Sequence, residues 1–581
     1  MERLTKINKR VNFSEATRAF VVATGVVCAA TVSASSSAVA AETFTNPIIP
    51  GGYPDPSICR VGEDFYIANS SFEYFPGLPI HHSKDLVNWE LIGHGLHRRD
   101  QVNGEVNLVD VQSDGGIHAP SLRCKDGKYY LITTNVYSPK ASGEPTQMVN
   151  FVITADHPEG PWSEPHVIDG APGIDPDLFF NDDGDVWYLG NHAPADAAYP
   201  GEGEIWLQRL DPETWQLIGE RHFLWRGALK RAIWAEGPHL YKHDGRYYLL
   251  VAEGGTSFNH AVTIAVSDEL TGPYEGNERN PILTSRHLSY DNWVNSTGHA
   301  DLVELDDGRW YMVALGIRND EERRSNMGRE THLIPVEWER EPYWWKEKKY
   351  LWPVAAPKTG RVERKTPLPF SGKNQQARLA FTDHFTSPKL GVEWTFRRVP
   401  AVDAYSLSAR RGFLRLQTQQ TVPSARARVA QLGIKQTETA FQFTARTEFE
   451  ASQSETEAGI SIFQKDNHYL NATVRKTAEK YVLNVTLANR GEPEILVSEA
   501  LPGYSGELEW RINSATGIYS ISYRLSADSE WSLLHQVPSN LLLSQYYTGA
   551  HIGFYTSSNG AETNDFMDID WVNFQARPSA E

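Results

Sequence analysis

The chain has 581 residues, of which 40% are apolar, 22% charged and 11% aromatic, and its 73 acidic side chains outnumber 55 basic ones. This length and composition predict a folded, acidic protein of roughly two to four domains and exclude a fibrous or disordered chain. The net charge of -18, with no Lys/Arg run to offset it, argues against a nucleic-acid partner, because such a surface repels a phosphate backbone.

Residues 1–41 have the pattern of a secretory signal peptide. Basic side chains precede an apolar run from Phe20 to Val32, and a small-residue end follows at 38–41. The run is shorter than the roughly 20 residues that a helix needs to span a bilayer, so we expect no membrane span. A lipid anchor on Cys28 is disfavoured because Val27 before it is larger than such sites prefer. We therefore expect a periplasmic or secreted protein.

The cysteines point to packing rather than to metal or redox chemistry. Cys28 would leave with the signal peptide, so the mature chain would keep Cys59 and Cys124. These two are compatible with one disulfide or with two buried thiols, and they are too few for a zinc cluster.

One pattern recurs five times in the first half of the chain. A small or polar residue is followed by an aliphatic residue, a turn glycine and an aromatic-rich segment, and the copies begin at Asp55, Ala119, Asp175, Gly237 and His299. Their separations of 64, 56, 62 and 62 residues indicate one structural unit each, and Asp-Gly between apolar runs indicates a hairpin. Five small antiparallel sheets without helical periodicity predict a five-bladed β-propeller over residues 44–352.

A second domain is predicted after the propeller. Residues 353–377 are rich in Pro, Lys, Arg and Gly and are predicted to be a linker. From residue 378 to 581, segments with period-two alternation, such as Phe413–Leu416 and Ile518–Tyr523, predict a concanavalin-like β-sandwich. The predicted fold class is therefore all-β. The sandwich shows no catalytic cluster, so it would bind glycan or support the propeller.

The leading residues of the repeat are the candidate functional site. The innermost strand of each propeller blade has one end at the axis, so Asp55, Asp175, His299 and Glu236, which precedes Gly237, should converge. An isolated carboxylate usually caps a turn or pairs with a neighbour. Three converging carboxylates exceed what packing requires and favour catalysis.

Three carboxylates in one pocket suit the hydrolysis of a glycosidic bond. That reaction needs one protonated carboxyl for the leaving oxygen and one ionised carboxylate for the attack. Neighbouring acids titrate as a coupled set, so one of them stays protonated near neutral pH. Glu236, which has the longer side chain and lies beside Trp234, is the candidate for that acid.

Several motifs in order support this interpretation. They are Gly51–Ser57, Ser70–Trp89, Gly173–Phe180, Glu236–Tyr241, Ala252–Thr256, Thr297–Val303 and Met327–Thr331. With these motifs the sequence resembles glycoside hydrolase family 43, in its β-xylosidase and α-L-arabinofuranosidase branch with a C-terminal β-sandwich domain. The resemblance implies that Asp55 is the general base, Glu236 the general acid and Asp175 the carboxylate that orients the acid. It also implies inversion, with base and acid roughly 6.5 to 9.5 Å apart.

The resemblance extends to other residues of the site. Arg329 is similar to the arginine that donates hydrogen bonds to sugar hydroxyls, with a surface salt bridge to Glu330 as the alternative. Phe72 is similar to the aromatic that lines the pocket. His299 is similar to the histidine that in many members lies beside a calcium ion at the propeller axis, often through water, with a hydrogen-bonded core histidine as the alternative. No cofactor is expected for the chemistry itself, and calcium would be structural.

Two positions depart from the family pattern. His118 stands where relatives commonly have a Trp, and His551 lies in a sandwich loop from which some relatives send an aromatic side chain over the pocket mouth. Both are candidate substrate contacts. They could signal a different sugar or linkage, or they could be neutral changes.

We therefore expect an exported, exo-acting, inverting glycosidase that releases a terminal pentose from xylan-type oligosaccharides. β-Xylosidase is favoured over α-L-arabinofuranosidase, and an enzyme with both activities is a further alternative. The alternative from another class is a carbohydrate-binding protein that does not cleave its ligand. The expected partner is the oligosaccharide substrate alone, with neither nucleic acid nor membrane.

Overall fold

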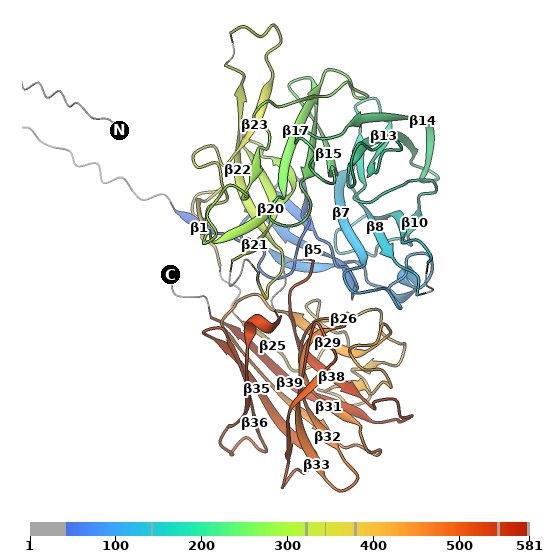
Figure 1. Cartoon of the computed structure of the whole chain (residues 1–581), viewed down its shortest axis with the longest axis vertical. Coiled ribbons are helices and arrows are strands. Elements are labelled where there is room, and N and C mark those ends of the chain that lie inside the picture. Colours follow the sequence, from blue (N-terminus) through green and yellow to red (C-terminus); the bar gives the residue numbers. More distant parts are fainter. Residues whose placement is uncertain are drawn as a thin grey trace, which may run out of the picture. The chain divides into compact units, whose positions relative to one another are not determined.

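The structure is a computed structural model that describes residues 42–140, 143–319, 324–342, 344–376, 380–542 and 547–577. The predicted signal peptide, residues 1–41, lies outside them. The described residues are almost entirely strand and loop, with two short 3₁₀-helices, η1 (Arg99–Val102) and η2 (Ser539–Leu542), so the all-β prediction is confirmed (Figure 1). Within this described part of the chain, no helix is long and apolar enough to cross a membrane.

Five antiparallel sheets form the predicted five-bladed propeller. Blade 1 contains β2 (Ser57–Val61), β3 (Asp64–Ala68), β5 (Gly77–Ser83) and β6 (Glu90–Leu96). Blade 2 contains β7 (Gly116–Lys125), β8 (Lys128–Tyr137), β9 (Gln147–Ala155) and β10 (His166–Val167). Blade 3 contains β11 (Asp177–Phe180), β12 (Val186–His192), β13 (Glu204–Asp211) and β14 (Gln216–Trp225).

The last two blades follow the same plan. Blade 4 contains β15 (Glu236–His243), β16 (Arg246–Glu253), β17 (Ala261–Ser267), β18 (Glu275–Gly276) and β19 (Leu283–Thr284). Blade 5 contains β20 (Val294–Glu304), β21 (Trp310–Arg318), β22 (Glu330–Arg340) and β23 (Leu351–Ala355). The innermost strands β2, β7, β11, β15 and β20 contact one another in a closed ring, as a propeller requires.

Local sequence and side-chain packing both support these blades. In the turn between β7 and β8, Asp126 and Gly127 have φ angles of 52° and 78°, and such positive values at both central residues are typical of a type I′ hairpin. Each pair of neighbouring blades shares its own apolar cluster, for example Ile67 of blade 1 with Val313 of blade 5. The blades are therefore held together by burial of apolar side chains between their faces.

Two eight-stranded sheets form the C-terminal sandwich. The first contains β25 (Ala380–Asp383), β27 (Tyr405–Ser406), β28 (Leu414–Gln417), β30 (Phe441–Phe449), β35 (Glu507–Ala515), β36 (Ile518–Arg524), β37 (Ser532–Pro538) and β39 (Phe566–Ala576). The second contains β4 (Tyr74–Phe75), β26 (Thr395–Arg397), β29 (Ala430–Lys435), β31 (Glu457–Lys465), β32 (His468–Lys476), β33 (Tyr481–Asn489), β34 (Glu494–Ala500) and β38 (His551–Ser557). Along β30, every second side chain is buried, so the two sheets enclose one apolar core.

The segment predicted as a linker is partly ordered into strands. Blade 5 continues to Ala355 through β23, and β24 (Lys365–Pro367) pairs with β1 (Thr43–Thr45). In the propeller, Cys59 of β2 and Cys124 of β7 form a disulfide with their Cα atoms 5.9 Å apart. Of the two states that the sequence left open, the structure has the disulfide, which joins the innermost strands of blades 1 and 2.

Candidate active site

The five leading residues of the repeat share one backbone conformation. Their φ angles are 51° at Asp55, 36° at Ala119, 53° at Asp175, 56° at Gly237 and 41° at His299. Residues with a side chain rarely adopt positive φ, and each instance costs about 1 to 3 kcal/mol. Such strain persists only where the surrounding structure holds it, and it clusters at functional sites.

The residues predicted to converge line one cavity of about 620 Å³. Asp55, Asp175, Glu236 and His299 all contribute to its wall, and all four side chains are buried. They come from the innermost strands of blades 1, 3, 4 and 5 or from the residues just before them. The propeller therefore brings together three carboxylates that are far apart in the sequence.

Hydrogen bonding orients the carboxylate of Asp55. The hydroxyl of Ser70 donates to its Oδ2 at 2.5 Å, and the same hydroxyl oxygen accepts the backbone N–H of Ala119 at 2.6 Å. The Nδ1 atom of His299 lies 3.8 Å from Oδ1 of Asp55. Asp55 is therefore held by Ser70 of its own blade, which is in turn bound by blade 2, and this suits a group that must position an attacking water.

Glu236 and Asp175 both hold protons more tightly than ordinary carboxyl groups. Burial and the negative charge of Asp55 raise the pKa of Glu236 to about 8, although Arg329 acts in the opposite direction. Burial, Glu236 and Asp55 raise the pKa of Asp175, while the backbone N–H of Gly237 stabilises its ionised form. Both carboxyls therefore keep a proton at neutral pH more readily than an exposed acid does, as a general acid requires.

Arg329 lies in the wall of the same cavity and is only 1% exposed. Its Nη2 donates to the carbonyl oxygen of Thr256 at 3.0 Å, and its Nε is buried without a hydrogen-bond partner among the described residues. Glu330 pairs instead with Arg318, at 2.6 Å between Oε2 and Nε. The alternative of a surface salt bridge to Glu330 does not hold, and Arg329 keeps a donor available for a ligand.

Three rings form one side of the pocket. His118 and Tyr547 line the cavity, while Phe72 packs against both, with ring centroids 4.9 Å from His118 and 5.2 Å from Tyr547. The Nδ1 atom of His118 lies 3.0 Å from the carbonyl oxygen of Gly116, and burial lowers the pKa of this imidazole. His118 is therefore neutral, with Nδ1 as the donor. Phe72 does not line the cavity as the resemblance implied; it is 1% exposed and supports the lining residues from behind.

His551 does not line the cavity, so the prediction that it contacts carbohydrate is wrong. Its ring stacks on Tyr74 at 3.9 Å and on Phe463 at 5.5 Å, and it is only 1% exposed. The sandwich side chain that reaches the pocket is Tyr547, four residues earlier, whose ring lies 4.8 Å from the guanidinium carbon of Arg329. The sequence analysis missed Tyr547; the signal that could have identified it is a bulky aromatic residue directly before Thr548 and Gly549.

The sandwich also supports the pocket wall through a strand pairing and an ion pair. Strand β4, which follows Phe72, pairs with β26 and so forms the edge of a sandwich sheet. Lys465 of β31 contacts Asp114, a cavity residue, at 2.6 Å. The cavity is therefore built by both domains, which favours the supporting role for the sandwich.

The rim beside Glu236 carries further side chains. Trp234 and Met148 line the cavity and are 47% and 48% exposed, and His192 and Glu202 lie on the same wall. Two of these residues, Trp234 and Glu202, belong to the segments that precede β15 and β13. An exposed indole near the acid can stack on a sugar of the leaving group.

The side chains around His299 bear on the calcium ion expected at the axis. Among the described residues, no group of three or more His, Cys, Asp or Glu side chains could hold a metal ion. Farther along the innermost strands, the carboxylates of Asp177 and Asp301 are already paired with the guanidinium of Arg123, at 2.7 and 2.9 Å. Burial lowers the pKa of His299, so its imidazole is neutral, as both the histidine beside calcium and the core histidine require.

Comparison with known proteins agrees with this site. Residues 44–342 match glycosyl hydrolases family 43, and residues 382–575 match the β-xylosidase C-terminal concanavalin A-like domain. The chain is 38% identical to a xylosidase/arabinosidase of Butyrivibrio fibrisolvens, over 91% of this chain and 99% of that one. It is 34% identical to a non-reducing end α-L-arabinofuranosidase of Bacteroides ovatus, over 92% of this chain and 96% of that one.

A solved structure shows the same two-domain architecture. The xylan β-1,4-xylosidase from Bacillus halodurans C-125 superposes with a TM-score of 0.82 at 29% identity, over 92% of this chain and 100% of that chain. The matched family covers the propeller that carries the three carboxylates. The chain therefore belongs to glycosyl hydrolase family 43 and is a glycosidase.

Proposed function

We propose that the protein is an exported, exo-acting, inverting glycosidase that removes a terminal pentose from xylan-type oligosaccharides, with β-xylosidase as its main activity. The observation that carries this proposal is the cavity shared by Asp55, Asp175 and Glu236, in which Glu236 has a raised pKa. One protonated and one ionised carboxyl in a buried pocket are the two groups that glycoside hydrolysis requires.

The roles of the three acids follow from their surroundings. Asp55, oriented by Ser70, accepts a proton from the water that attacks the anomeric carbon. Glu236 donates its proton to the glycosidic oxygen as the bond breaks, so the leaving sugar departs as a neutral alcohol. The negative charge of Asp55 helps to keep the acid protonated, and Asp175 accepts a hydrogen bond from the N–H of Gly237, the residue after the acid, and so orients it.

Arg329 and Tyr547 suit the binding of one terminal sugar. The guanidinium offers donors for vicinal hydroxyls, and the tyrosine ring beside it closes the pocket from the sandwich. A pocket closed on one side accepts a chain end rather than the middle of a polymer, which supports the exo mode. The exposed Trp234 at the rim supports binding of the next sugar along the chain.

α-L-Arabinofuranosidase is the second candidate activity. It is supported by the similarity to the Bacteroides ovatus enzyme, named as a non-reducing end α-L-arabinofuranosidase, and to the xylosidase/arabinosidase of Butyrivibrio fibrisolvens. His118 gives this pocket a smaller and more polar wall than a Trp would, which bears on the choice of sugar. An enzyme with both activities would satisfy both similarities.

The test is release of 4-nitrophenol from the β-D-xylopyranoside, the α-L-arabinofuranoside and a hexoside, with Asp55→Ala as the control. We expect pentoside cleavage that the variant loses, and the ratio of the two rates identifies the main activity. Proton NMR of the first product from xylobiose would show the α-anomer if the reaction inverts. No cleavage of either pentoside would contradict the proposal.

Export is tested separately, because it depends on residues 1–41 alone. Their basic, apolar and small-residue segments support a signal peptide. N-terminal sequencing of the protein recovered from the periplasm or medium should start near Glu42. A cytosolic protein that keeps its first residues would refute export and leave the enzymatic proposal intact.

A further inference from the structure

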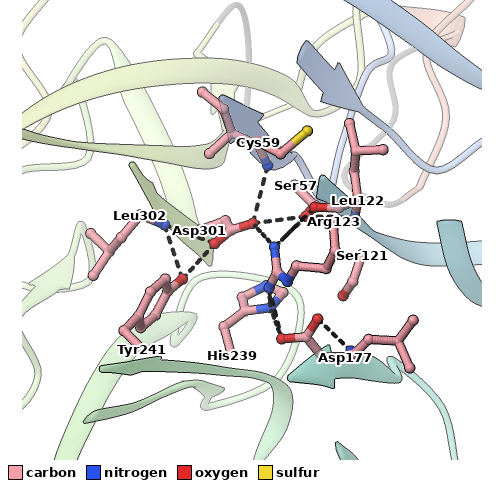
Figure 2. A network of polar contacts seen from close by, with 12 residues as sticks. Ser57, Cys59, Ser121, Leu122, Arg123, Asp177, His239, Tyr241, Asp301 and Leu302 are labelled. Atoms are coloured by element: carbon pink, nitrogen blue, oxygen red, sulfur yellow. Dashed lines mark hydrogen bonds and ion pairs between the residues drawn. The ribbon is translucent and has the colours of Figure 1, made fainter. Parts of the chain in front are cut away.

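The innermost strands carry a second set of polar residues beyond those at the cavity (Figure 2). In each of the five strands this residue lies two positions after the leading residue of the repeat. These residues, together with two more from the same strands, are here named the axial ring. Its members are Ser57, Ser121, Arg123, Asp177, His239, Tyr241 and Asp301.

Hydrogen bonds link the ring across blades 5, 1, 2 and 3. The hydroxyl of Ser57 donates to Oδ2 of Asp301 at 2.7 Å and accepts the N–H of Leu122 at 2.9 Å. The hydroxyl of Ser121 donates to the carbonyl oxygen of Pro176 at 2.9 Å. Pro176 directly follows the catalytic-site residue Asp175, so the ring reaches the strand ends that form the cavity.

The remaining links close the circle through blade 4. The Nδ1 atom of His239 lies 3.0 Å from Oδ2 of Asp177, which joins blade 4 to blade 3. The hydroxyl of Tyr241 donates to Oδ1 of Asp301, which joins blade 4 to blade 5 (Figure 2). All five blades therefore meet in one buried polar network.

Arg123 is the one arginine or lysine of the ring and connects its two carboxylates. Its Nη1 donates to Oδ2 of Asp301 at 2.9 Å and its Nη2 to Oδ2 of Asp177 at 2.7 Å, while His239 Nδ1 lies 2.8 Å from Nη2. Burial alone would raise the pKa of Asp301, but Arg123, His239 and two hydroxyl donors hold it far below its usual range. Both carboxylates are nearly inaccessible to solvent, so removing the guanidinium would leave buried charge uncompensated.

We propose that Arg123 is a positioning residue for catalysis and the cation that joins the blades at the propeller axis. It ties blades 3 and 5 to blade 2, and thereby fixes the strands that present Asp55, Asp175 and Glu236. The positive φ angles of the leading residues need this support, because strained conformations persist only when their surroundings hold them. A misplacement of about 1 Å between acid and base can cost roughly 100-fold in rate.

The experiment compares the full-length wild type with Arg123→Lys and Arg123→Ala on whichever pentoside the wild type cleaves. Arg415→Lys is the matched control, because Arg415 forms a similar two-point pair with Asp568 in the sandwich, far along the chain from the ring. Thermal unfolding and near-ultraviolet circular dichroism establish the folded fraction of each variant. Kinetics are then expressed per folded molecule.

We expect Arg123→Lys to fold and to lose roughly 10- to 100-fold in kcat with little change in KM, because positioning rather than ground-state binding is impaired. Arg123→Ala should lose more, and millimolar guanidinium chloride should restore part of its kcat while sodium chloride does not. Arg415→Lys should keep the wild-type kcat. Chelation with EDTA should leave wild-type activity unchanged.

Three results would overturn the proposal. One is a folded Arg123→Lys or Arg123→Ala with wild-type kcat. Another is a loss of activity that is fully explained by a smaller folded fraction, with no recovery of activity or of melting temperature when guanidinium is added. The third is wild-type activity that EDTA abolishes and calcium restores. If the wild type cleaves no pentoside, the proposed function fails. Recovery of the melting temperature of Arg123→Ala by guanidinium would then still show whether the Arg123 side chain joins the blades in the axial ring.

Discussion

The proton on Glu236 leads to a prediction about how activity depends on pH. This side chain is buried, and burial together with the charge of Asp55 raises its pKa to about 8. A group whose folded pKa is raised keeps its proton below that value and loses it as the pH increases through it. The protonated fraction therefore falls from about 0.9 at pH 7 to about 0.1 at pH 9, a change of about tenfold.

The measurement is kcat/KM across this pH range on xylobiose and on 4-nitrophenyl β-D-xylopyranoside. On xylobiose, kcat/KM should fall about tenfold from pH 7 to pH 9, because the leaving sugar needs the proton. Glu236→Gln should lose about 10²- to 10⁴-fold on xylobiose at neutral pH and much less on the aryl glycoside, and its alkaline decline should vanish. Glu202→Gln, which changes another buried carboxyl of the same cavity, should keep the decline.

Two results would refute this reasoning. Equal losses on both substrates would show that Glu236 does not protonate the leaving group. An alkaline decline that persists in Glu236→Gln would assign the titration to another group, such as Asp175, whose pKa is also raised by burial and by its acidic neighbours.

Four further predictions concern the residues that line the pocket and the domain that completes it. Asp55→Asn should abolish cleavage of both xylobiose and the aryl glycoside, because both need the base; survival of either reaction would remove Asp55 from that role. Arg329→Met should raise KM roughly tenfold or more and move the alkaline decline to higher pH, since Arg329 lowers the pKa of Glu236; an unchanged pH profile would contradict that coupling. Tyr547→Ala should raise KM more than it lowers kcat, because this side chain lines the pocket. A chain ending near Thr359 lacks Tyr547 and β26, and it should be inactive even if circular dichroism shows that its strands have formed. Full activity of that shorter chain would show that the sandwich is dispensable.

Much of the fold followed from local pattern. The repeat beginning at Asp55 and ending with the copy at His299 predicted five blades, because each copy carries its own hairpin turn and alternating strand. Convergence of Asp55, Asp175 and Glu236 also followed, because equivalent ends of innermost strands must meet at a propeller axis. These statements need only the order and spacing of residues along the chain.

Contacts between segments that are distant in the sequence could not be predicted from local pattern. The sequence suggested His551 at the pocket mouth, but packing of β38 against Tyr74 buries it, and Tyr547 takes the place beside Arg329, 218 positions away along the chain. A one-dimensional pattern states which loop approaches a pocket and does not state which of its side chains points inward, because that depends on the register and packing of the sheet beneath.

The same distinction applies to the axis of the propeller. By itself the sequence determined the number of blades, the order of the domains and the three acids, since periodicity and turn chemistry are local properties. Only the tertiary structure decided that Cys59 pairs with Cys124, that Arg123 pairs with Asp177 and Asp301 of other blades, and that the sandwich completes the pocket. The physical reason is that these are pair interactions across blades and domains, whose strength depends on distance and burial in space rather than on separation along the chain.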